Sequence, residues 1–474
     1  MSQSPETCAG HATISTGAFP HVHGIFQNTW YDPQRNPNDV IPCTDDESAT
    51  PVLYSGKGKA DGPGRLLVPS FADEMRTQKS SRVVTLALKA RSAIMLAGHG
   101  GDAVTWMNDD MDGWQTAKTY SSAPLPSIKA WLDQHPVDAD FGKTWTRLLP
   151  ATAYTEVDDG EAEAPLKGWS STFPHVLKGD SDKPDKLFHD KWQHSPYADA
   201  YVGNMAAALV EQFQLGKHGS TDVLAVSFSS PDLVGHQFGP DSQEVRDMYA
   251  ALDRTVGELL TRLDTLVGRG QYTVALSADH GVTPIPEQLR RKGRSAGRLS
   301  AGAVRTTIEK AAAAALGDGQ YVARVNTNDI YFRPGVYEAL SQKRGALAGV
   351  IDAIVKMDGM DRVLRKEEIA GPEAAASPDP IVRAAALSYV PARSGQLILV
   401  TRPGWMFSND GTTHGSANPD DQRVPVLFYG KGIKPGLYRD AATPADVTPT
   451  LAAIVGITMP RAEGHTLTAA LARK

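Results

Sequence analysis

The sequence predicts an α/β fold with a doubly wound, mostly parallel sheet flanked by helices. Short apolar or β-branched runs each end in a polar loop, and helical patterns lie between them. Strands that alternate with helices favour a parallel sheet covered on both faces. The chain has 474 residues, of which 41% are hydrophobic and 22% charged, so it can bury a large core.

The runs at 222–230, 272–281, 395–404 and 423–432 each predict a buried strand followed by a polar loop. After residue 241, apolar side chains recur at helical spacing up to Leu263 and predict a long amphipathic helix. The alanine-rich run at 310–319 predicts a helix that stops at a glycine.

Two stretches, at about 103–195 and about 285–395, lack this alternation and are rich in Trp, Pro, Gly and charged residues. We interpret them as inserted cap or small subdomain segments over the ligand-binding edge of the sheet, in a single domain spanning 1–474.

The composition excludes several classes of protein. The net charge of -6 gives no basic surface for a nucleic-acid backbone, and no apolar run reaches the 18 residues of a membrane span. Cys8 and Cys43 are too few for a disulfide scaffold or a zinc knuckle, and either one disulfide or two free thiols fits the sequence.

Candidate metal ligands follow the predicted strands. Asp232 and His236 stand four residues apart in "SPDLVGH", Asp279 and His280 are adjacent in "SADHG", and His414 lies in the late loop "DGTTHGSANP". Doubly wound sheets bind ligands at the carboxyl ends of their strands. Carboxylate and imidazole groups without thiolates suit zinc or a similar divalent ion, and this set suits two ions.

The segments "PETCAGHATISTGAFPHVHGIFQN", "SPDLVGH", "SADHG" and "THG" resemble the alkaline phosphatase superfamily, in its branch with a threonine nucleophile. That branch contains the PafA-type alkaline phosphatases and the nucleotide pyrophosphatase/phosphodiesterases. The resemblance implies that Thr7 is the nucleophile, at a helix start that favours phosphoryl oxygens, and that Asn28 binds one of these oxygens. It assigns one zinc to Asp232, His236 and His414, and the other to Asp279, His280 and the Thr7 oxygen.

Cys8 is a rival nucleophile beside Thr7. A cysteine phosphatase loop needs an arginine six residues on, where this chain has Ile14, and a sulfatase start needs Pro and Arg where Gly10 and Ala12 stand. We therefore expect only the backbone N–H of Cys8 to face the substrate.

Lys89 and Arg91 distinguish two classes of ester. We expect them on the same side of an extended segment, where the pattern alone also fits a solvated strand edge. The resemblance implies instead the Lys-x-Arg pair with which PafA-type phosphatases bind the terminal phosphoryl oxygens, and two cations suit a dianionic phosphate. The sequence thus predicts a phosphate monoester hydrolase that forms a phospho-threonine and acts on small phosphate esters. A nucleotide phosphodiesterase and an inactive phosphate- or metal-binding relic are the alternatives.

The family carries one further zinc-ligating Asp at the end of a first strand, well before the nucleophile. None of the six residues Met1–Glu6 can be that Asp. We expect an N-terminally shortened sequence, with loss of a ligand and a strand as the alternative. By resemblance, the protein is expected to be periplasmic or secreted, although these first residues do not form a signal peptide.

Overall fold

The computed structural model describes residues 3–109 and 111–472, which form two compact units. The sequence predicts a single domain, and the chain crosses from one unit to the other several times. The first unit contains Met1–Ala9, Phe19–Cys43 and His280–Arg423, and the second contains Gly10–Ala18, Thr44–Asp279 and Val424–Lys474.

The second unit is built on a five-stranded sheet in the order β3 (Pro51–Leu53), β6 (Trp114–Ala117), β5 (Ala103–Met107), β4 (Val83–Ala87) and β9 (Val223–Ser227). Its centre is parallel, because β4 pairs in parallel with both β5 and β9. Toward one edge, β6 runs antiparallel to β5 and to β3. Every residue of β4 and β5 is buried, as expected for strands covered on both faces. The predicted α/β class is confirmed, with a sheet that is mixed.

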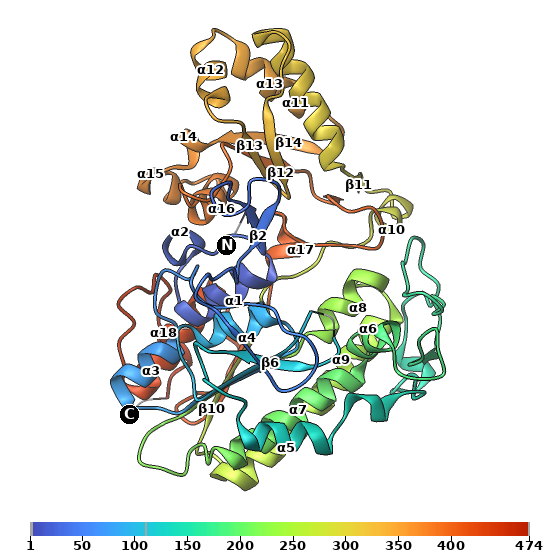
Figure 1. Ribbon diagram of the computed structural model, residues 1–474, viewed down its shortest axis with the longest axis vertical. Helices are drawn as coiled ribbons and strands as arrows, with labels where there is room; N and C mark the ends of the chain where they lie inside the picture. Colours follow the sequence, from blue (N-terminus) through green and yellow to red (C-terminus); the bar gives the residue numbers. More distant parts are fainter. Residues whose placement is uncertain (1–2, 110, 473–474) are drawn as a thin grey trace. The chain divides into compact units, whose positions relative to one another are not determined.

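Two long helices of this unit, α7 (Pro196–Gln212) and α9 (Gln243–Leu263), pack against each other and lie side by side in Figure 1. The amphipathic helix predicted after residue 241 is α9: Val245 and Met248 are buried, whereas Asp253 and Arg254 are exposed. The unit also contains most of α1 (Thr7–Thr16), together with α3 (Phe71–Lys79), α4 (Ala90–Ala97), α5 (Pro126–Gln134), α6 (Lys186–Gln193), α8 (Ser230–Phe238), α18 (Val447–Val455) and the strand pairs β7 (Thr144–Trp145) with β8 (His175–Val176) and β10 (Thr273–Ser277) with β17 (Val426–Gly430).

The first unit contains a four-stranded antiparallel sheet in the order β12 (Val322–Asn326), β13 (Asp329–Phe332), β15 (Leu397–Thr401) and β14 (Met360–Arg365). Helices α11 (Ala301–Leu316), α12 (Val336–Gln342) and α13 (Ala346–Val355) share one hydrophobic cluster with this sheet. Helices α14 (Lys366–Ile369), α15 (Pro372–Ala375) and α16 (Pro380–Ser388) share another. The remaining elements are α2 (Pro20–His23), α10 (Pro286–Arg291), α17 (Pro419–Gln422) and the strand pairs β1 (Thr29–Tyr31) with β2 (Val40–Pro42) and β11 (Gly297–Arg298) with β16 (Trp405–Met406).

All four predicted strands are present, as β9, β10, β15 and β17, but they do not share one parallel sheet. The strand predicted at 395–404 is β15, in the antiparallel sheet of the first unit. Leu397 and Leu399 face one hydrophobic cluster, and Ile398 and Val400 face the other. A strand buried on both faces is a continuous apolar run in either kind of sheet, so its sequence pattern does not identify the sheet. The alanine-rich helix is confirmed as α11, whose end is capped by Gly317.

The two predicted inserted segments differ in their relation to the sheets. The stretch of about 103–195 begins with β5 and β6, which belong to the five-stranded sheet, so a separate segment starts only after Ala117. Its later part contributes Trp145, Trp169 and Phe188 to the main core of the second unit. The stretch of about 285–395 lies in the first unit and has a core of its own around α11 and α13.

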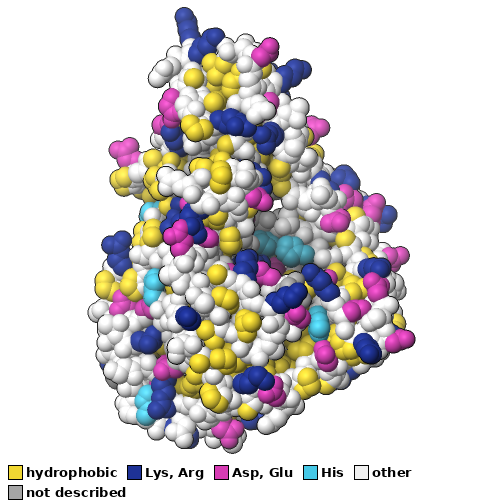
Figure 2. Space-filling model, in the orientation of Figure 1, with side chains coloured by type: hydrophobic (Ala, Val, Ile, Leu, Met, Phe, Trp, Pro, Cys, Tyr) yellow, Lys and Arg dark blue, Asp and Glu magenta, His cyan; other side chains and the backbone are white. Residues whose placement is uncertain are grey.

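Acidic and basic side chains are interspersed on the face drawn in Figure 2, where no continuous basic region gathers. Within residues 3–109 and 111–472, no helix combines the length and hydrophobicity that crossing a bilayer requires.

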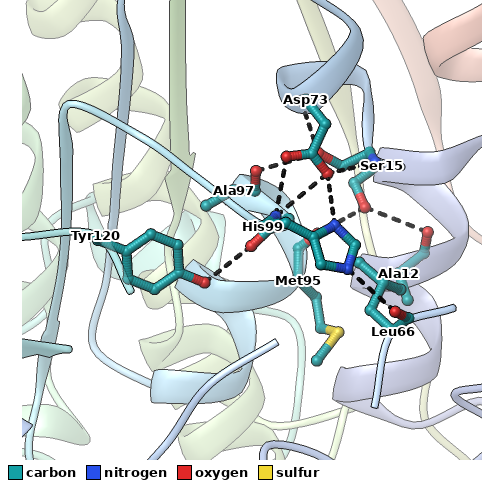
Figure 3. Close-up of polar contacts among 10 residues, drawn as sticks. Ala12, Ser15, Leu66, Asp73, Met95, Ala97, His99 and Tyr120 are labelled. Carbon is teal, nitrogen blue, oxygen red and sulfur yellow. Dashed lines mark hydrogen bonds and ion pairs between the residues drawn. The ribbon is translucent and has the colours of Figure 1, made fainter. Parts of the chain in front are cut away.

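Three side-chain hydroxyls hold the carboxyl end of α4 (Figure 3). The last carbonyls of a helix have no partner within the helix. Here Ser15 donates to the Met95 carbonyl at 2.6 Å, and Ser70 and Tyr120 donate to the carbonyls of Ala97 and Gly98 at 3.1 and 2.9 Å. Helix α4 is thereby attached to α1 and α3, which stabilises the position of its amino end.

His99, directly after this helix end, contacts two acceptors in Figure 3. Its Nδ1 lies 2.9 Å from an Asp73 carboxylate oxygen, and its Nε2 lies 3.1 Å from the Leu66 carbonyl oxygen. Only the doubly protonated imidazolium can donate to both. The hydrogen bond that His99 donates to Asp73 is the main reason that the pKa of His99 is raised above its ordinary value of 6.5, and burial opposes this shift.

We predict that His99→Gln lowers the free energy of unfolding most below about pH 6.5 and least at higher pH. Because the pKa of His99 is raised in the folded protein, the stability from its charged form is fully present below its unfolded pKa. It is lost as the pH rises through the folded pKa. Urea unfolding of both proteins between about pH 6 and about pH 9 measures this difference. A difference that stays constant over this range would contradict the prediction.

Candidate active site

Two of the predicted site segments directly follow the parallel strands β4 and β9. Residue Ala87 at the end of β4 pairs with Ser227 at the end of β9, so both chains leave the sheet at the same edge. Lys89 follows β4, and Asp232 lies on α8 after β9. The Lys89 ammonium forms an ion pair with an Asp232 carboxylate oxygen.

Asp232 and His236 lie one turn apart on α8, where residues at this spacing share a face. The His236 Nε2 is 3.4 Å from the Asp232 Oδ1, while Lys89 contacts the Oδ2. The side chains of these two residues therefore converge on one face of α8. This arrangement brings one carboxylate, one imidazole and one ammonium together in the second unit.

A buried carboxylate, Asp199 of α7, anchors the turn that leads into α8. Its Oδ1 accepts hydrogen bonds from the N–H groups of Ser229 and Ser230 at 3.2 and 3.3 Å and from the Ser230 hydroxyl at 3.1 Å. Burial raises the pKa of Asp199 to about 7, against the effect of these donors. The turn is thus held by a group that the sequence motifs did not single out.

Lys89 and Arg91 do not lie together in one extended segment, so the prediction that they share one is wrong. Lys89 is the N-cap of α4 in extended backbone, whereas Arg91 stands in the first helical turn. The residues after Lys89, "ARSAIMLA", include strong helix formers, so the helix starts almost directly after β4. Among the described residues, the buried Nε of Arg91 has no hydrogen-bond acceptor.

Asp279, which follows β10, contacts His11 of α1. The His11 Nδ1 lies 3.2 Å from the Asp279 Oδ2, and its Nε2 lies 2.9 Å from the Ser227 hydroxyl. His11 therefore links the ends of β9 and β10, and the sequence analysis missed it. Its spacing of four residues from Thr7, on the same face of a helix, is the signal that could have revealed it.

In the first unit, His280 and His414 stack with their ring centroids 3.5 Å apart. The Nδ1 of His280 lies 2.9 Å from the Gly281 carbonyl oxygen, and the Nδ1 of His414 lies 2.9 Å from the Pro5 carbonyl oxygen. Because a carbonyl only accepts, each Nδ1 carries the proton, and Nε2 is the nitrogen suited to a metal. In metal-binding histidines, the ring nitrogen that does not bind the metal commonly donates its N–H in this way.

Asp421 joins the loops that carry these two histidines. Its Oδ1 accepts from the Thr283 hydroxyl at 2.8 Å, and its Oδ2 accepts from the Ser416 N–H and hydroxyl at 3.0 and 2.6 Å. Burial raises its pKa. Asp421 thus orients both loops from behind, a role that no local motif indicates.

Thr7 is the first residue of α1 and is buried. Next to it, the Cys8 N–H donates to the Asn28 Oδ1 at 2.8 Å, and the Asn28 N–H donates to a Glu6 carboxylate oxygen at 2.6 Å. The expectation that the Cys8 N–H faces the substrate therefore needs correction, because this donor already has the Asn28 oxygen as its partner. The same bond orients the Asn28 side chain toward the start of α1.

Cys8 and Cys43 form a disulfide, which resolves the two alternatives that the sequence left open. Cys8 has no thiol in this state, so it cannot act as the rival nucleophile. The bond attaches the first turn of α1 to the end of β2.

Comparisons with known proteins cover nearly the whole chain. A family model described as type I phosphodiesterase / nucleotide pyrophosphatase matches residues 2–420. Alkaline phosphatase PhoV of Synechococcus elongatus is 33% identical over 466 residues, which cover 96% of this chain and 82% of that protein. Alkaline phosphatase PafA of Elizabethkingia meningoseptica is 31% identical over 486 residues, which cover 98% of this chain and 86% of that protein. The crystal structure of wild-type PafA matches with a TM-score of 0.88 at 28% identity, covering 99% of this chain and 90% of that chain.

We predict that Gly10→Ala destabilises the protein by about 1–3 kcal/mol. A Cβ at this position of α1 would lie 2.2 Å from the Asp279 backbone oxygen, so the helix or the end of β10 has to shift. Gly257→Ala in α9 is the matched control, because its Cβ meets nothing within 4 Å. We expect that change to leave stability unaltered or raise it by up to about 1 kcal/mol. Equal stabilities of the two variants in urea unfolding would show that α1 does not depend on this close approach.

Proposed function

Because the chain belongs to the type I phosphodiesterase / nucleotide pyrophosphatase family, we propose that it cleaves phosphate monoesters through a phospho-threonine at Thr7, with two zinc ions. It is a phosphoric monoester hydrolase of the alkaline phosphatase superfamily. Relatives named alkaline phosphatase, at 31% and 33% identity over nearly the whole chain, support this class.

Its proposed substrates are small phosphate esters. The proposed location is the periplasm or the cell exterior, and the later part of 103–195 and the stretch 285–395 are proposed to cover the site.

The donor set fits zinc. Asp232 and His236 converge on one face of α8, and both His280 and His414 carry their proton on Nδ1, which suits metal binding through Nε2. When bound, two such ions supply Lewis-acid stabilisation of phosphoryl oxygens and favour the deprotonated form of the nucleophile. One ion would be held by Asp232, His236 and His414, and the other by Asp279, His280 and Thr7.

Thr7 would act as the nucleophile. Its hydroxyl gives its proton to water, its oxygen forms a bond to phosphorus, and the bond between phosphorus and the leaving oxygen breaks. The leaving oxygen takes up a proton from water, and a phospho-threonine remains. Water then cleaves that ester and returns the threonine with inorganic phosphate. The start of α1 favours negative charge, and Asn28, oriented by the Cys8 N–H, would bind a phosphoryl oxygen.

The single observation that favours monoesters is the placement of two cations at the amino end of α4. Lys89 stands beside Asp232, a proposed metal ligand, and Arg91 follows in the first turn. A phosphate monoester carries one more negative charge than a diester, so it gains more from two cations. A nucleotide phosphodiesterase is the second candidate, because the matching family model bears that description.

We predict that the purified, zinc-loaded protein contains about two zinc ions per chain and that His414→Ala lowers this content. Loss of one of three proposed protein ligands weakens one site. The control is His189→Ala, because His189 pairs with Asp138 and belongs to neither proposed site. Elemental analysis by mass spectrometry measures the zinc, and hydrolysis of an aryl phosphate by the loaded protein measures activity. An unchanged zinc content in His414→Ala would refute the ligand assignment, and full loading without hydrolysis would support the inactive relic.

We predict that Lys89→Ala and Arg91→Ala each lower kcat/KM for a monoester roughly tenfold or more, and for a diester much less. Each lost charge-assisted contact costs about 1.5–3 kcal/mol. Lys217→Ala serves as the control, because this exposed lysine precedes β9 at the opposite end of the strand. Equal losses on both esters in steady-state assays would favour the phosphodiesterase, provided the zinc content is unchanged.

A further inference from the structure

The turn between β12 and β13 lies in the first unit and contacts three segments that carry proposed site residues. Asn326 pairs with Asp329 across the strands, so the two residues between them form a two-residue loop. We refer to residues Asn326–Asn328 as the hairpin turn. It belongs to the stretch of about 285–395, for which the sequence predicts an inserted segment and in which no predicted site residue lies.

The side-chain amide of Asn328 joins the loop of His414 to the segment before Thr7. Its Nδ2 donates to the Gly415 carbonyl at 2.5 Å and to the Ser4 hydroxyl at 3.2 Å. The backbone carbonyl of the same residue accepts a hydrogen bond from β15 at 2.7 Å, and the residue is buried. A side chain fixed to the four-stranded sheet thus holds both segments at a set distance.

The orientation of the His414 ring depends on that distance. Its Nδ1 donates to the Pro5 carbonyl at 2.9 Å, and Asn328 bonds the neighbours of both partners, Gly415 and Ser4. Without the Asn328 amide, fewer hydrogen bonds hold the two segments together, and the ring can turn away from the Pro5 carbonyl. The nitrogen Nε2, which is suited to a metal, would turn with it.

Asn326 bonds the residues on both sides of Asn28. Its Nδ2 donates to the Gln27 Oε1 at 3.0 Å and to the Thr29 carbonyl at 2.8 Å. The Gln27 amide donates in turn to the Asp329 Oδ2 at 2.9 Å, and Asp329 is the strand partner of Asn326. This closed set of hydrogen bonds fixes the backbone from which the Asn28 side chain extends.

The residue between the two asparagines has a strained backbone. Thr327 has a φ of 47°, a left-handed conformation that glycine adopts readily and a β-branched residue rarely does. Such strain persists only where the surrounding structure fixes the backbone, and it is common at functional sites. The Thr327 hydroxyl lies 3.5 Å from a Glu6 carboxylate oxygen, so this residue also contacts the segment before Thr7.

We propose that the hairpin turn positions the nucleophile, the phosphoryl-binding asparagine and one zinc ligand relative to one another. Asn328 is the positioning residue for His414 and Thr7, and Asn326 is the positioning residue for Asn28. This inference rests on the proposed function, which assigns those three residues their roles. The inserted stretch then contributes to the site without a group that touches the substrate.

Two binding measurements on the zinc-loaded protein test the inference. We expect Asn328→Ala to weaken zinc retention against a competing chelator about 10–100-fold, because it removes a support of a metal ligand. We expect Asn326→Ala to weaken binding of inorganic phosphate about three- to tenfold in isothermal titration calorimetry, with unchanged zinc content. A merely structural role would lower Tm in both variants and leave both affinities of the folded protein unchanged.

The matched control is Gln396→Ala, which removes a hydrogen bond from the same hairpin far from its turn. The Gln396 Oε1 accepts from the Phe332 N–H at 2.9 Å, at the opposite end of β13. We expect this variant to have a lower Tm and unchanged affinities for zinc and phosphate. If Asn328→Ala does not fold, Asn326→Ala decides.

The inference is overturned if either folded variant binds its ligand as tightly as the unaltered protein does. It is also overturned if Gln396→Ala weakens binding as much as the two turn variants. Failure of the proposed function is a different result, because it is seen in the unaltered protein, which would then retain no zinc or hydrolyse no phosphate monoester when loaded.

Discussion

The parallel register of β4 and β9 is the constraint on which the candidate site depends. With Ala87 opposite Ser227, both chains leave the sheet at one level, and Lys89 meets Asp232 although 143 residues separate them. A shift of one residue in this pairing would turn every side chain of β9 to the opposite face. The hydroxyls that hold the far end of α4 keep this helix from sliding along β4. The register of β4 with β9 therefore controls the positions of the cations Lys89 and Arg91.

Two buried carboxylates, Asp199 and Asp421, anchor loops around this frame. Asp199 and Asp421 each accept at least three hydrogen bonds, and each orients a loop that carries proposed metal ligands. Their donors offset part of the cost of burial.

Local patterns predict the α/β class and the long helix α9, because both follow from periodicity along one segment. The grouping of Asp232 with His236 is implied only by the family resemblance. The sheet to which β15 belongs could not be predicted, since burial on both faces looks alike in parallel and antiparallel surroundings. Arg91 is helical rather than extended because β4 passes into α4 within two residues. His11, Glu6 and Asp421 act through contacts between distant segments, which a single sequence does not encode in any local motif.

The disulfide between Cys8 and Cys43 makes the start of α1 sensitive to the redox conditions of maturation. It closes a sequence separation of 35 residues, for which the loss of chain entropy in the unfolded state corresponds to about 4 kcal/mol. In a thiol-reducing compartment this bond does not persist. Protein produced there would lack the disulfide, and only hydrogen bonds would join the segments that carry Thr7 and Asn28. Oxidative folding is therefore part of what makes the first turn of α1 rigid. The choice of expression host then decides whether the purified protein carries this disulfide.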